Sequence, residues 1–178
     1  MDNRVIVRVA GIGDLPRLLK LCREMEQVDG VEDTSDSPAV GVATLSPLDR
    51  KDVFIQMLTS PYLTVLVAQR GQELIGTLTL AVHPGLAHGG RPWAVVESVV
   101  VAETHHGQGI RTVLMETAIG QAQAAGCYKL AVITDLAPGS VRDFYEKLGL
   151  RHAYAGYELE LRTAPPSDGI EILRRAFA

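Results

Sequence analysis

The sequence predicts a single α/β domain of the α+β type, in which a mixed, mostly antiparallel sheet of about six or seven strands is flanked by helices. Three observations support this fold class. The chain has 178 residues, of which 47% are hydrophobic, so it suits one domain with a sizeable core. Three apolar segments follow one another with only turn-forming residues between them, which predicts an antiparallel meander. A helical segment then leads to a further strand, which this crossover makes parallel to its predecessor.

The first part of the chain is predicted to hold a strand and two helices. Residues 4–10 form a short apolar strand, and residues 14–27 carry apolar side chains at the spacing of one helical face. Asp14 is expected to cap this first helix. Residues 28–46 are rich in Gly, Asp, Ser and Pro, which is typical of a loop, and a second helix is expected over residues 48–59.

The middle of the chain predicts the meander. Residues 62–69 and 73–83 are apolar and β-branched, and the turn signal Arg70-Gly71 separates them. Residues 84–92 then form a long loop rich in Gly and Pro. Residues 93–101 are apolar at most consecutive positions, so this strand is expected to lie in the centre of the sheet with both faces covered.

A helix, a strand and another helix are predicted after the meander. Residues 111–125 form the first of these helices, which Gly126 ends. Residues 128–134 predict the strand that lies parallel to its neighbour, and residues 141–148 predict the next helix. Residues 152–162 are expected to return as one or two strands. They are also the candidate surface for a homodimer, which the sequence leaves open.

Composition limits the classes of partner. The domain is expected to span residues 1–162, with a linker and a short tail helix over residues 163–178. The formal net charge of −4 and the lack of any block of Lys or Arg argue against a nucleic-acid partner. No apolar run reaches the roughly 20 residues that span a bilayer. The N-terminus carries no secretory signal, so no membrane and a cytoplasmic location are expected.

The cysteines and histidines do not predict a metal or redox site. The two cysteines form no CxxC pair and are too few for a disulfide framework. The five histidines lack the spacing of metal ligands. We therefore expect no metal, and the partner to be a small molecule or a protein.

A glycine-rich turn joins the strand over residues 93–101 to the following helix. Gly107 and Gly109 allow the backbone to turn sharply and to bring N–H groups close to a ligand. The first turn of a helix also has unpaired N–H groups and a partial positive charge, so the turn is suited to a phosphate or diphosphate. A dinucleotide-binding fingerprint would need a third glycine where Thr112 stands, and a Gly-Lys-Ser/Thr loop is absent.

Two motifs resemble the GNAT superfamily of N-acetyltransferases. The acetyl-CoA loop of that family, Arg/Gln-x-x-Gly-x-Gly/Ala, is matched by His106-Gly107-Gln108-Gly109-Ile110-Arg111. Its later motif, Phe-Tyr-x-x-x-Gly-Phe, is matched by Phe144-Tyr145-Glu146-Lys147-Leu148-Gly149-Leu150. His106 replaces the usual Arg or Gln, and Arg111 replaces the usual Gly or Ala. Three further segments look like glucosamine-6-phosphate N-acetyltransferases: residues 96–101, 126–129 and 157–162.

The resemblance implies that acetyl-CoA is the co-substrate and that its pantetheine arm lies along the edge of the strand over residues 93–101. Backbone groups of Val99 and Val101 would bind the arm, and residues 107–112 would bind the diphosphate. Arg111 either pairs with a phosphate or turns outward. The full set of expected cofactor-binding residues is Val99, Val100, Val101, His106, Gly107, Gln108, Gly109, Ile110, Arg111, Thr112, Ser140 and Tyr145.

Two residues are candidates for the chemistry. An alkyl amine is overwhelmingly protonated at pH 7, so transfer to it needs a proton acceptor. Glu97 lies within an apolar strand, where a carboxylate is unfavourable unless it faces a polar cleft, so it is the candidate general base or amine anchor, acting directly or through water. A solvated face is the alternative. The resemblance makes Tyr145 the acid that protonates the leaving thiolate, and a core aromatic is its alternative.

The acceptor is expected to be a primary amine of a small molecule, an amino sugar or similar. It would enter between the first two helices, the loop that joins them and the loop over residues 84–92. Arg91 and His83 are candidates for an anionic group of the acceptor, although a surface position fits them equally. The alternatives are acetylation of a protein or peptide, and a non-catalytic domain that senses acetyl-CoA.

Overall fold

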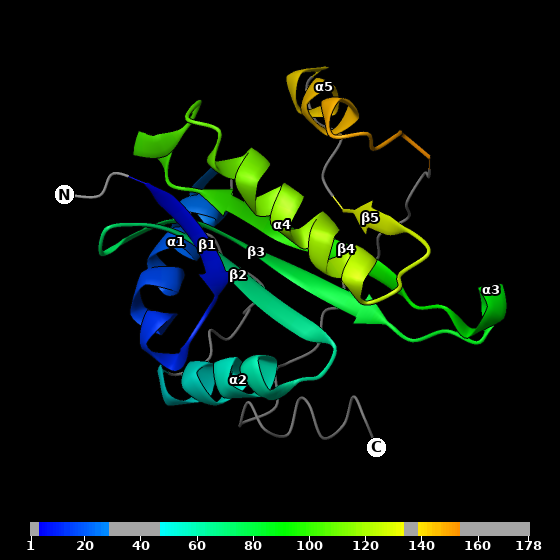
Figure 1. Ribbon diagram of the computed structural model, residues 1–178. Coiled ribbons are helices and arrows are strands. Elements are labelled where there is room, and N and C mark those ends of the chain that lie inside the picture. The colour runs from blue at the N-terminus through cyan, green and yellow to red at the C-terminus, as the bar shows by residue number, and fades with distance from the viewer. Residues whose placement is uncertain (1–3, 29–46, 134–138, 154–178) are drawn as a thin grey trace, which may run out of the picture.

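The computed structural model describes residues 4–28, 47–133 and 139–153 (Figure 1). One sheet has the strand order β1-β2-β3-β4-β5. The first four strands pair antiparallel, and β5 pairs parallel with β4, so the mixed sheet and the meander are confirmed. The strands are β1 (Val5–Val9), β2 (Leu63–Arg70), β3 (Glu73–His83), β4 (Trp93–Val101) and β5 (Leu130–Val132).

Within the described residues the sheet has five strands, where six or seven were expected for the whole chain. Residues 152 and 153 are not in a strand, and the rest of the predicted strand region and dimer surface, residues 154–162, lies outside the described residues. The predicted tail helix does so too. Of the predicted strand over residues 128–134, β5 covers the three positions that pair with β4, and residue 134 lies outside the described residues.

Helices cover both faces of the sheet (Figure 1). One face carries α4, and the other carries α1 and α2. Short helical segments lie between the main elements, and one of them, α3, falls inside the predicted loop over residues 84–92. The helices are α1 (Leu15–Val28), α2 (Pro47–Thr59), α3 (Ala87–Gly90), α4 (Ile110–Ala124) and α5 (Gly139–Lys147), with 3-10 turns η1 (Ile12–Asp14) and η2 (Glu103–His105).

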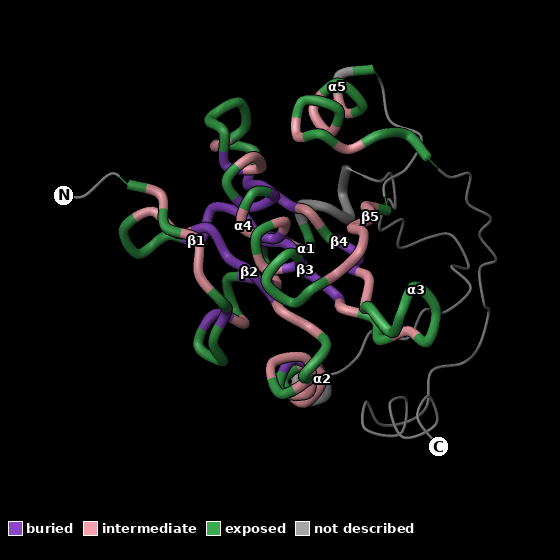
Figure 2. The backbone as a smooth tube through the Cα atoms, turned by 45° about the vertical axis from the view of Figure 1, so that its right-hand side comes forward, coloured by how far each residue is buried: buried purple, intermediate pink, exposed green. Residues whose placement is uncertain are grey.

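The α4 face holds the larger core, which we call the α4-side core. Figure 2 shows the buried backbone concentrated in the middle strands, beneath α4. Gly76 of β3 lets the helix approach, because a Cβ there would lie 3.2 Å from Leu114 Cδ1 and 3.0 Å from the Val100 carbonyl oxygen. The most deeply buried members of this core are Leu66, Ile75, Leu78, Leu80, Val96, Ile110, Leu114 and Met115.

The opposite face holds the α1/α2-side core. Leu18 and Leu21 of α1 lie three residues apart, on one face of the helix, and both are buried. Phe54 of α2 packs into the same cluster. The sheet contributes Val65, Val67, Leu74, Val100 and Ala102. The apolar spacing that predicted the first helix therefore also identifies the face that it buries.

The carboxylate of Asp14 binds Arg8 of β1 and takes part in a capping box with Gly11 at the start of η1, the 3-10 turn that leads into α1. Its carboxylate accepts hydrogen bonds from Arg8 Nη1 at 2.6 Å, from Arg8 Nη2 at 2.9 Å and from the Gly11 N–H at 2.8 Å. The bidentate Arg8 contact is the main reason that the pKa of Asp14 lies below its ordinary value. Asp14 therefore joins the N-terminus of α1 to β1, a tertiary contact that the local pattern did not show.

Within the described ranges, none of the helices combines the length and the apolarity that crossing a membrane requires.

Candidate functional site

The pairing between β4 and β5 stops half-way along β4. β5 pairs only with the segment 94–96 of β4. The last contact is the hydrogen bond from the Ile133 N–H to the Val96 carbonyl, which is long at 3.4 Å. From Glu97 to Val101, β4 keeps β3 as a neighbour, and β5 no longer accompanies it on the other side. Within the described residues, which exclude 134–138, β4 therefore has one edge without a paired strand over this stretch, which we call the open edge.

A bulge lies where the strands separate. Thr79 pairs with Glu97 and Thr77 pairs with Val100, so the single residue between the threonines faces both Ser98 and Val99. Ser98 takes a positive φ of 53°, a conformation that costs a residue with a Cβ about 1–2 kcal/mol. The strain marks this point of the strand as a candidate functional position.

The bulge changes which residues of β4 face each core. Val96 and Val99 both pack with the α4-side core, although an undisturbed strand would place residues three apart on opposite faces. Val100 points into the α1/α2-side core. Because side chains alternate along a strand, Glu97 lies on the α1/α2 face, next to Val96 on the other. Glu97 is exposed, so its carboxylate can reach a substrate from that face.

Two of the predicted positions direct their backbone groups to the open edge, and at one of them, Val101, the carbonyl already accepts a hydrogen bond from His106. The Ala102 N–H donates to the Ile75 carbonyl at 3.0 Å, which directs Ala102 and, by alternation, Val100 toward β3. Val101 and Val99 therefore present their backbone groups to the open edge. His106 Nε2 lies 2.8 Å from the Val101 carbonyl oxygen, and because a carbonyl only accepts, this nitrogen donates. The structure thus brings Val99 and Val101, but not Val100, to this edge.

The glycine-rich turn has the form of an anion site. Gly107 and Gly109 have φ values of 73° and 77°, and Gly109 precedes α4 as its N-cap. No side chain caps this helix, so the N–H groups of its first turn are left for another acceptor. The first hydrogen bond of the helix runs from the Val113 N–H to the Gly109 carbonyl at 3.2 Å. Exposed glycines and free amides in this arrangement fit a diphosphate.

The β2–β3 turn holds this anion site in place. Arg70 Nη1 donates to Gln108 Oε1 at 2.9 Å, and Gln108 Nε2 donates to the Thr104 carbonyl at 3.2 Å. His105 Nε2 lies 4.0 Å from Glu73 Oε2 of the same turn. Sequence reasoning missed Arg70, because it lies 38 residues from Gln108 and no local pattern relates the two.

Arg111 turns toward α5. Its guanidinium lies over the ring of Phe144, 5.6 Å from the ring centre, which is the geometry of a cation–π contact. Phe144 in turn meets the ring of Tyr145 edge to face, with the centres 5.0 Å apart. The cation in the first turn of α4 is thereby held close to the aromatic pair of the second motif.

Tyr145 is a half-buried phenol beside the α4-side core. Burial raises the pKa of Tyr145 above its ordinary value, and the nearby charge of Arg111 offsets part of that increase. The phenol is therefore protonated at neutral pH and can donate a proton. Glu97 and Tyr145 belong to opposite faces of the sheet, with the gap between β4 and β5 separating those faces. Ser140 lies in the first turn of α5, but its side chain is not described.

A model of the acetyltransferase (GNAT) family matches residues 29–150. The chain belongs to this family. The resemblance inferred from the two motifs is thus confirmed, and transfer of an acetyl group is the activity for which the family is named. No curated protein sequence gives a significant match to the chain.

Solved GNAT structures share this fold. A putative acetyltransferase from Agrobacterium tumefaciens is 31% identical, with a TM-score of 0.74 over 88% of this chain and 99% of that one. A glucosamine-6-phosphate N-acetyltransferase from Arabidopsis thaliana is 14% identical, with a TM-score of 0.72 over 88% and 98%. An aminoglycoside acetyltransferase from an uncultured soil sample is 20% identical, with a TM-score of 0.69 over 90% and 98%. The last two likenesses show the fold alone.

The residues expected near an anionic acceptor have structural partners in this GNAT chain. Arg91 Nε donates to the Gly126 carbonyl and its Nη2 to the Cys127 carbonyl, both at 3.3 Å, so Arg91 interacts with the C-terminal end of α4. His83 stacks on Trp93 with ring centres 4.9 Å apart. Lys129 Nζ lies 4.7 Å from the centre of the Trp93 ring and is a cation that sequence reasoning did not single out.

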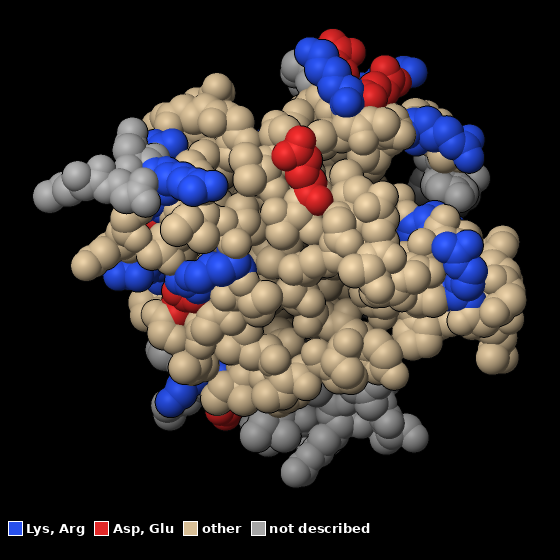
Figure 3. Space-filling model, in the orientation of Figure 1, with Lys and Arg blue, Asp and Glu red and all other residues tan. Residues whose placement is uncertain are grey.

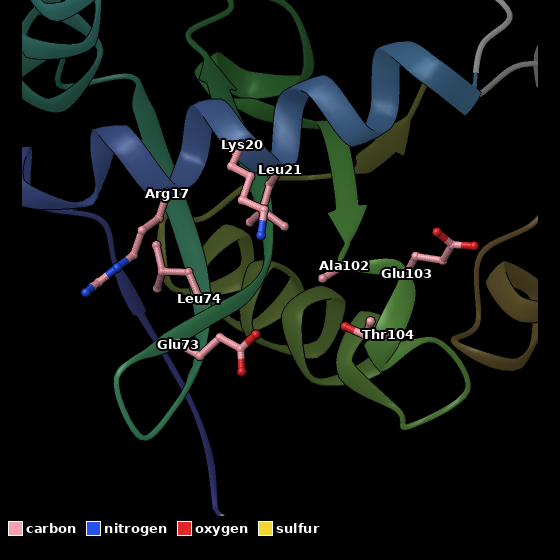
Figure 4. A pocket seen from close by; sticks show the side chains of 8 residues that line it. All are labelled: Arg17, Lys20, Leu21, Glu73, Leu74, Ala102, Glu103 and Thr104. Atoms are coloured by element: carbon pink, nitrogen blue, oxygen red, sulfur yellow. The ribbon is translucent and has the colours of Figure 1, made fainter.

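A cavity of about 360 Å³ lies beside the start of the glycine-rich turn, away from both candidate catalytic residues (Figure 4). In that view Lys20 extends from α1 toward the strand ends, and the guanidinium group of Arg17 points away from the other labelled side chains. Glu73 and Glu103 supply opposite charge on the strand side. All four charged side chains are solvent-exposed. Two are positive and two are negative, so neither sign of charge predominates around the cavity.

Charged side chains are dispersed on the face shown in Figure 3. The basic ones lie around its edge rather than in one patch. Across the described ranges, no cluster of three or more His, Cys, Asp or Glu side chains is placed to hold a metal ion. His105 and His106 have different partners. His105 contacts Thr104 and Glu73, and His106 contacts the Val101 carbonyl.

Proposed function

We propose that this GNAT chain transfers the acetyl group of acetyl-CoA to a primary amine of a small molecule, by direct attack within a ternary complex in the cytoplasm. The open edge of β4 beside the glycine-rich turn is the observation that carries the proposal. A diphosphate on the amides of Gly107–Thr112 would direct a pantetheine arm along Val101 and Val99. The arm would then lead to the bulge, where Glu97 and Tyr145 belong to opposite faces.

The proposed reaction begins on the α1/α2 face. Glu97 takes a proton from the ammonium group of the acceptor, directly or through one water, and so supplies the free amine. The amine nitrogen then forms a bond to the acetyl carbon. Backbone groups of Val99 and Val101 hold the donor at the edge of β4, so that much of the rate would come from positioning the two substrates.

The reaction ends on the α4 face. The carbon–sulfur bond breaks, and its electron pair goes to the sulfur of coenzyme A. Tyr145 gives its proton to that sulfur and prevents the thiolate from attacking the new amide. Burial supports this role, because it raises the pKa of the phenol and keeps the proton in place until charge develops on the sulfur.

The positive charge of Arg111 would strengthen the attraction of the glycine-rich turn for a diphosphate. Its guanidinium lies above Phe144, beside the first-turn amides, within reach of a diphosphate that binds there. A long cation at a position where the resemblance leads one to expect Gly or Ala therefore adds a charge to the site rather than blocking it.

A thiol-release assay tests the proposed function. Acetyl-CoA is supplied with a panel of small primary amines, amino sugars among them, and with peptides that carry a free N-terminus or lysine. Release of coenzyme A with small amines alone is the expected result. Release with peptides alone would establish a protein acetyltransferase instead. Binding of acetyl-CoA by calorimetry without release for any acceptor would establish a sensor.

A further inference from the structure

Ser98 lies in the candidate site and has no role in the proposed reaction. Among the described residues, Ser98 and His88 are the only ones other than glycine with positive φ. His88 lies in the exposed turn of the β3–β4 hairpin, where such conformations are common, whereas Ser98 lies in the middle of a strand. Glycine would take this conformation without strain, so the serine side chain needs a separate explanation.

The bulge places the Ser98 side chain on the α4 face. Val96 and Val99 are both on that face, and alternation assigns Glu97 to the other, so Ser98 and Val99 are consecutive residues on one side of the sheet. Tyr145 packs against the same core. Ser98 therefore shares a face with the proposed acid and not with the proposed base.

The hydroxyl of Ser98 is available to a ligand. The residue is exposed, and no hydrogen bond to its side chain occurs in the part of the chain that the structure describes. β5 has ended its pairing two residues earlier, so the backbone beside Ser98 is already part of the open edge. A strained residue with a free hydroxyl thus lies at the point where the two strands separate.

We propose that Ser98 is a catalytic residue whose hydroxyl donates a hydrogen bond to the sulfur that leaves the acetyl group. This inference rests on the proposed function. The amine nitrogen bonds to the acetyl carbon, the carbon–sulfur bond breaks with its electron pair on sulfur, and Tyr145 supplies the proton. Ser98 keeps its own proton and stabilises the developing negative charge before that transfer is complete.

The direction of this hydrogen bond follows from the two faces. Glu97 handles the amine from the α1/α2 side, and the backbone of the β4 edge holds the donor. The sulfur is the atom whose charge increases most on the α4 side as the bond breaks. A donor aimed there interacts more strongly in the transition state than with the uncharged thioester, so it raises turnover rather than affinity.

Three substitutions separate this role from a structural one. Ser98→Gly removes the hydroxyl and relieves the strained φ, so the melting temperature is expected to rise by roughly 2–4 °C while kcat falls roughly tenfold. Ser98→Ala keeps the strain and is expected to lose a similar factor in kcat. Ser98→Asn tolerates positive φ and keeps a donor, so it should retain more kcat than either. The KM for acetyl-CoA should stay within about twofold in all three.

Controls fix the meaning of each outcome. Ser60→Ala removes a serine hydroxyl outside the site and should leave kcat unchanged. Ser98→Ala and Tyr145→Phe together should lose less than the product of the single losses, because both groups act on one sulfur. A Ser98→Gly variant with the turnover of the wild type would overturn the inference and leave the proposed function intact. A wild-type protein that releases no coenzyme A with any amine would overturn both.

Discussion

The two halves of β4 both contain valines but have different neighbours. From Ala94 to Val96 the strand is paired with β3 on one side and with β5 on the other. From Glu97 to Val101 it keeps only β3 in regular pairing, and a bulge with a strained serine marks the change. Both halves contain valines, and the two polar residues of the strand, Glu97 and Ser98, begin the second half.

This difference shows where the backbone of the strand becomes available to a ligand, although Val100 and Val101 remain buried in the cores. In the first half the backbone N–H and C=O groups can form hydrogen bonds to the neighbouring strands, and the side chains fill the two cores. In the second half one row of backbone groups is left for a ligand, and the only carboxylate of the strand is exposed there. The ligand-binding capacity of this GNAT chain thus comes from interrupting a sheet rather than from adding a separate loop.

The largest expected effect is on the base in the open half. Glu97→Gln should lower kcat about 100-fold at pH 7, because it removes the proton acceptor. The loss should shrink as pH rises, since the fraction of free amine increases about tenfold per unit below its pKa of about 10.4. Steady-state rates from pH 6 to 9 check this, with Glu116→Gln on α4 as the control. Full turnover across that range would assign Glu97 to a solvated face.

The acid on the α4 face should have the next largest effect. Tyr145→Phe is expected to lower kcat about 50-fold with little change in the KM for acetyl-CoA. Because burial raises the pKa of Tyr145, the wild-type rate should be lost only above the ordinary tyrosine value of about 10, and the variant should lack that alkaline limb. An unchanged kcat in the variant would remove the tyrosine from the chemistry.

Valine truncation compares the two halves directly. Val96→Ala, in the paired half and fully buried, should lower the free energy of unfolding by about 2 kcal/mol, roughly a 30-fold change in the folding equilibrium. Val99→Ala, half-buried in the open half, should cost less than about 1 kcal/mol. Urea denaturation measures both. Equal losses would mean that the open half is as structural as the paired one.

The smallest expected effect concerns the support of the glycine-rich turn. Gln108→Ala removes the bond from Arg70 and the bond to the Thr104 carbonyl. Loss of about 1 kcal/mol of preorganisation should weaken acetyl-CoA binding roughly fivefold without changing kcat. Calorimetric titration checks this, with Gln72→Ala in the same hairpin as the control. If the Gln108→Ala variant and the wild type bind acetyl-CoA with equal affinity, the glycine-rich turn does not depend on these two hydrogen bonds.

The strands and helices were predictable because their signals are local. The bounds of β3 and β4 agree with the apolar runs, and Gly126 and Gly149 follow the ends of α4 and α5 in left-handed conformations, as the C-terminal signals predict. The order of strands and one helical crossover were enough to predict that β5 lies parallel to β4.

The site was predictable only in outline. Motif spacing predicted the glycine-rich turn and Tyr145, and a carboxylate within an apolar strand predicted Glu97. Neither signal showed that the open edge starts after Val96 or that Arg111 lies over Phe144. Val100 was grouped with its neighbours as a cofactor contact, whereas its backbone faces β3 and its side chain enters the α1/α2-side core. Sequence reasoning had no means of locating the bulge that separates these roles.

The sequence by itself determined the order of elements and the residue types that carry the chemistry, since periodicity, turn residues and motifs depend on close neighbours along the chain. Only the tertiary structure decided which atoms meet. Arg8 binds Asp14, Arg70 binds Gln108, and Ser98 opposes β3 beside Val99 because packing of the two cores fixes the register between distant segments. That register depends on the fit of the whole sheet, which no single segment contains.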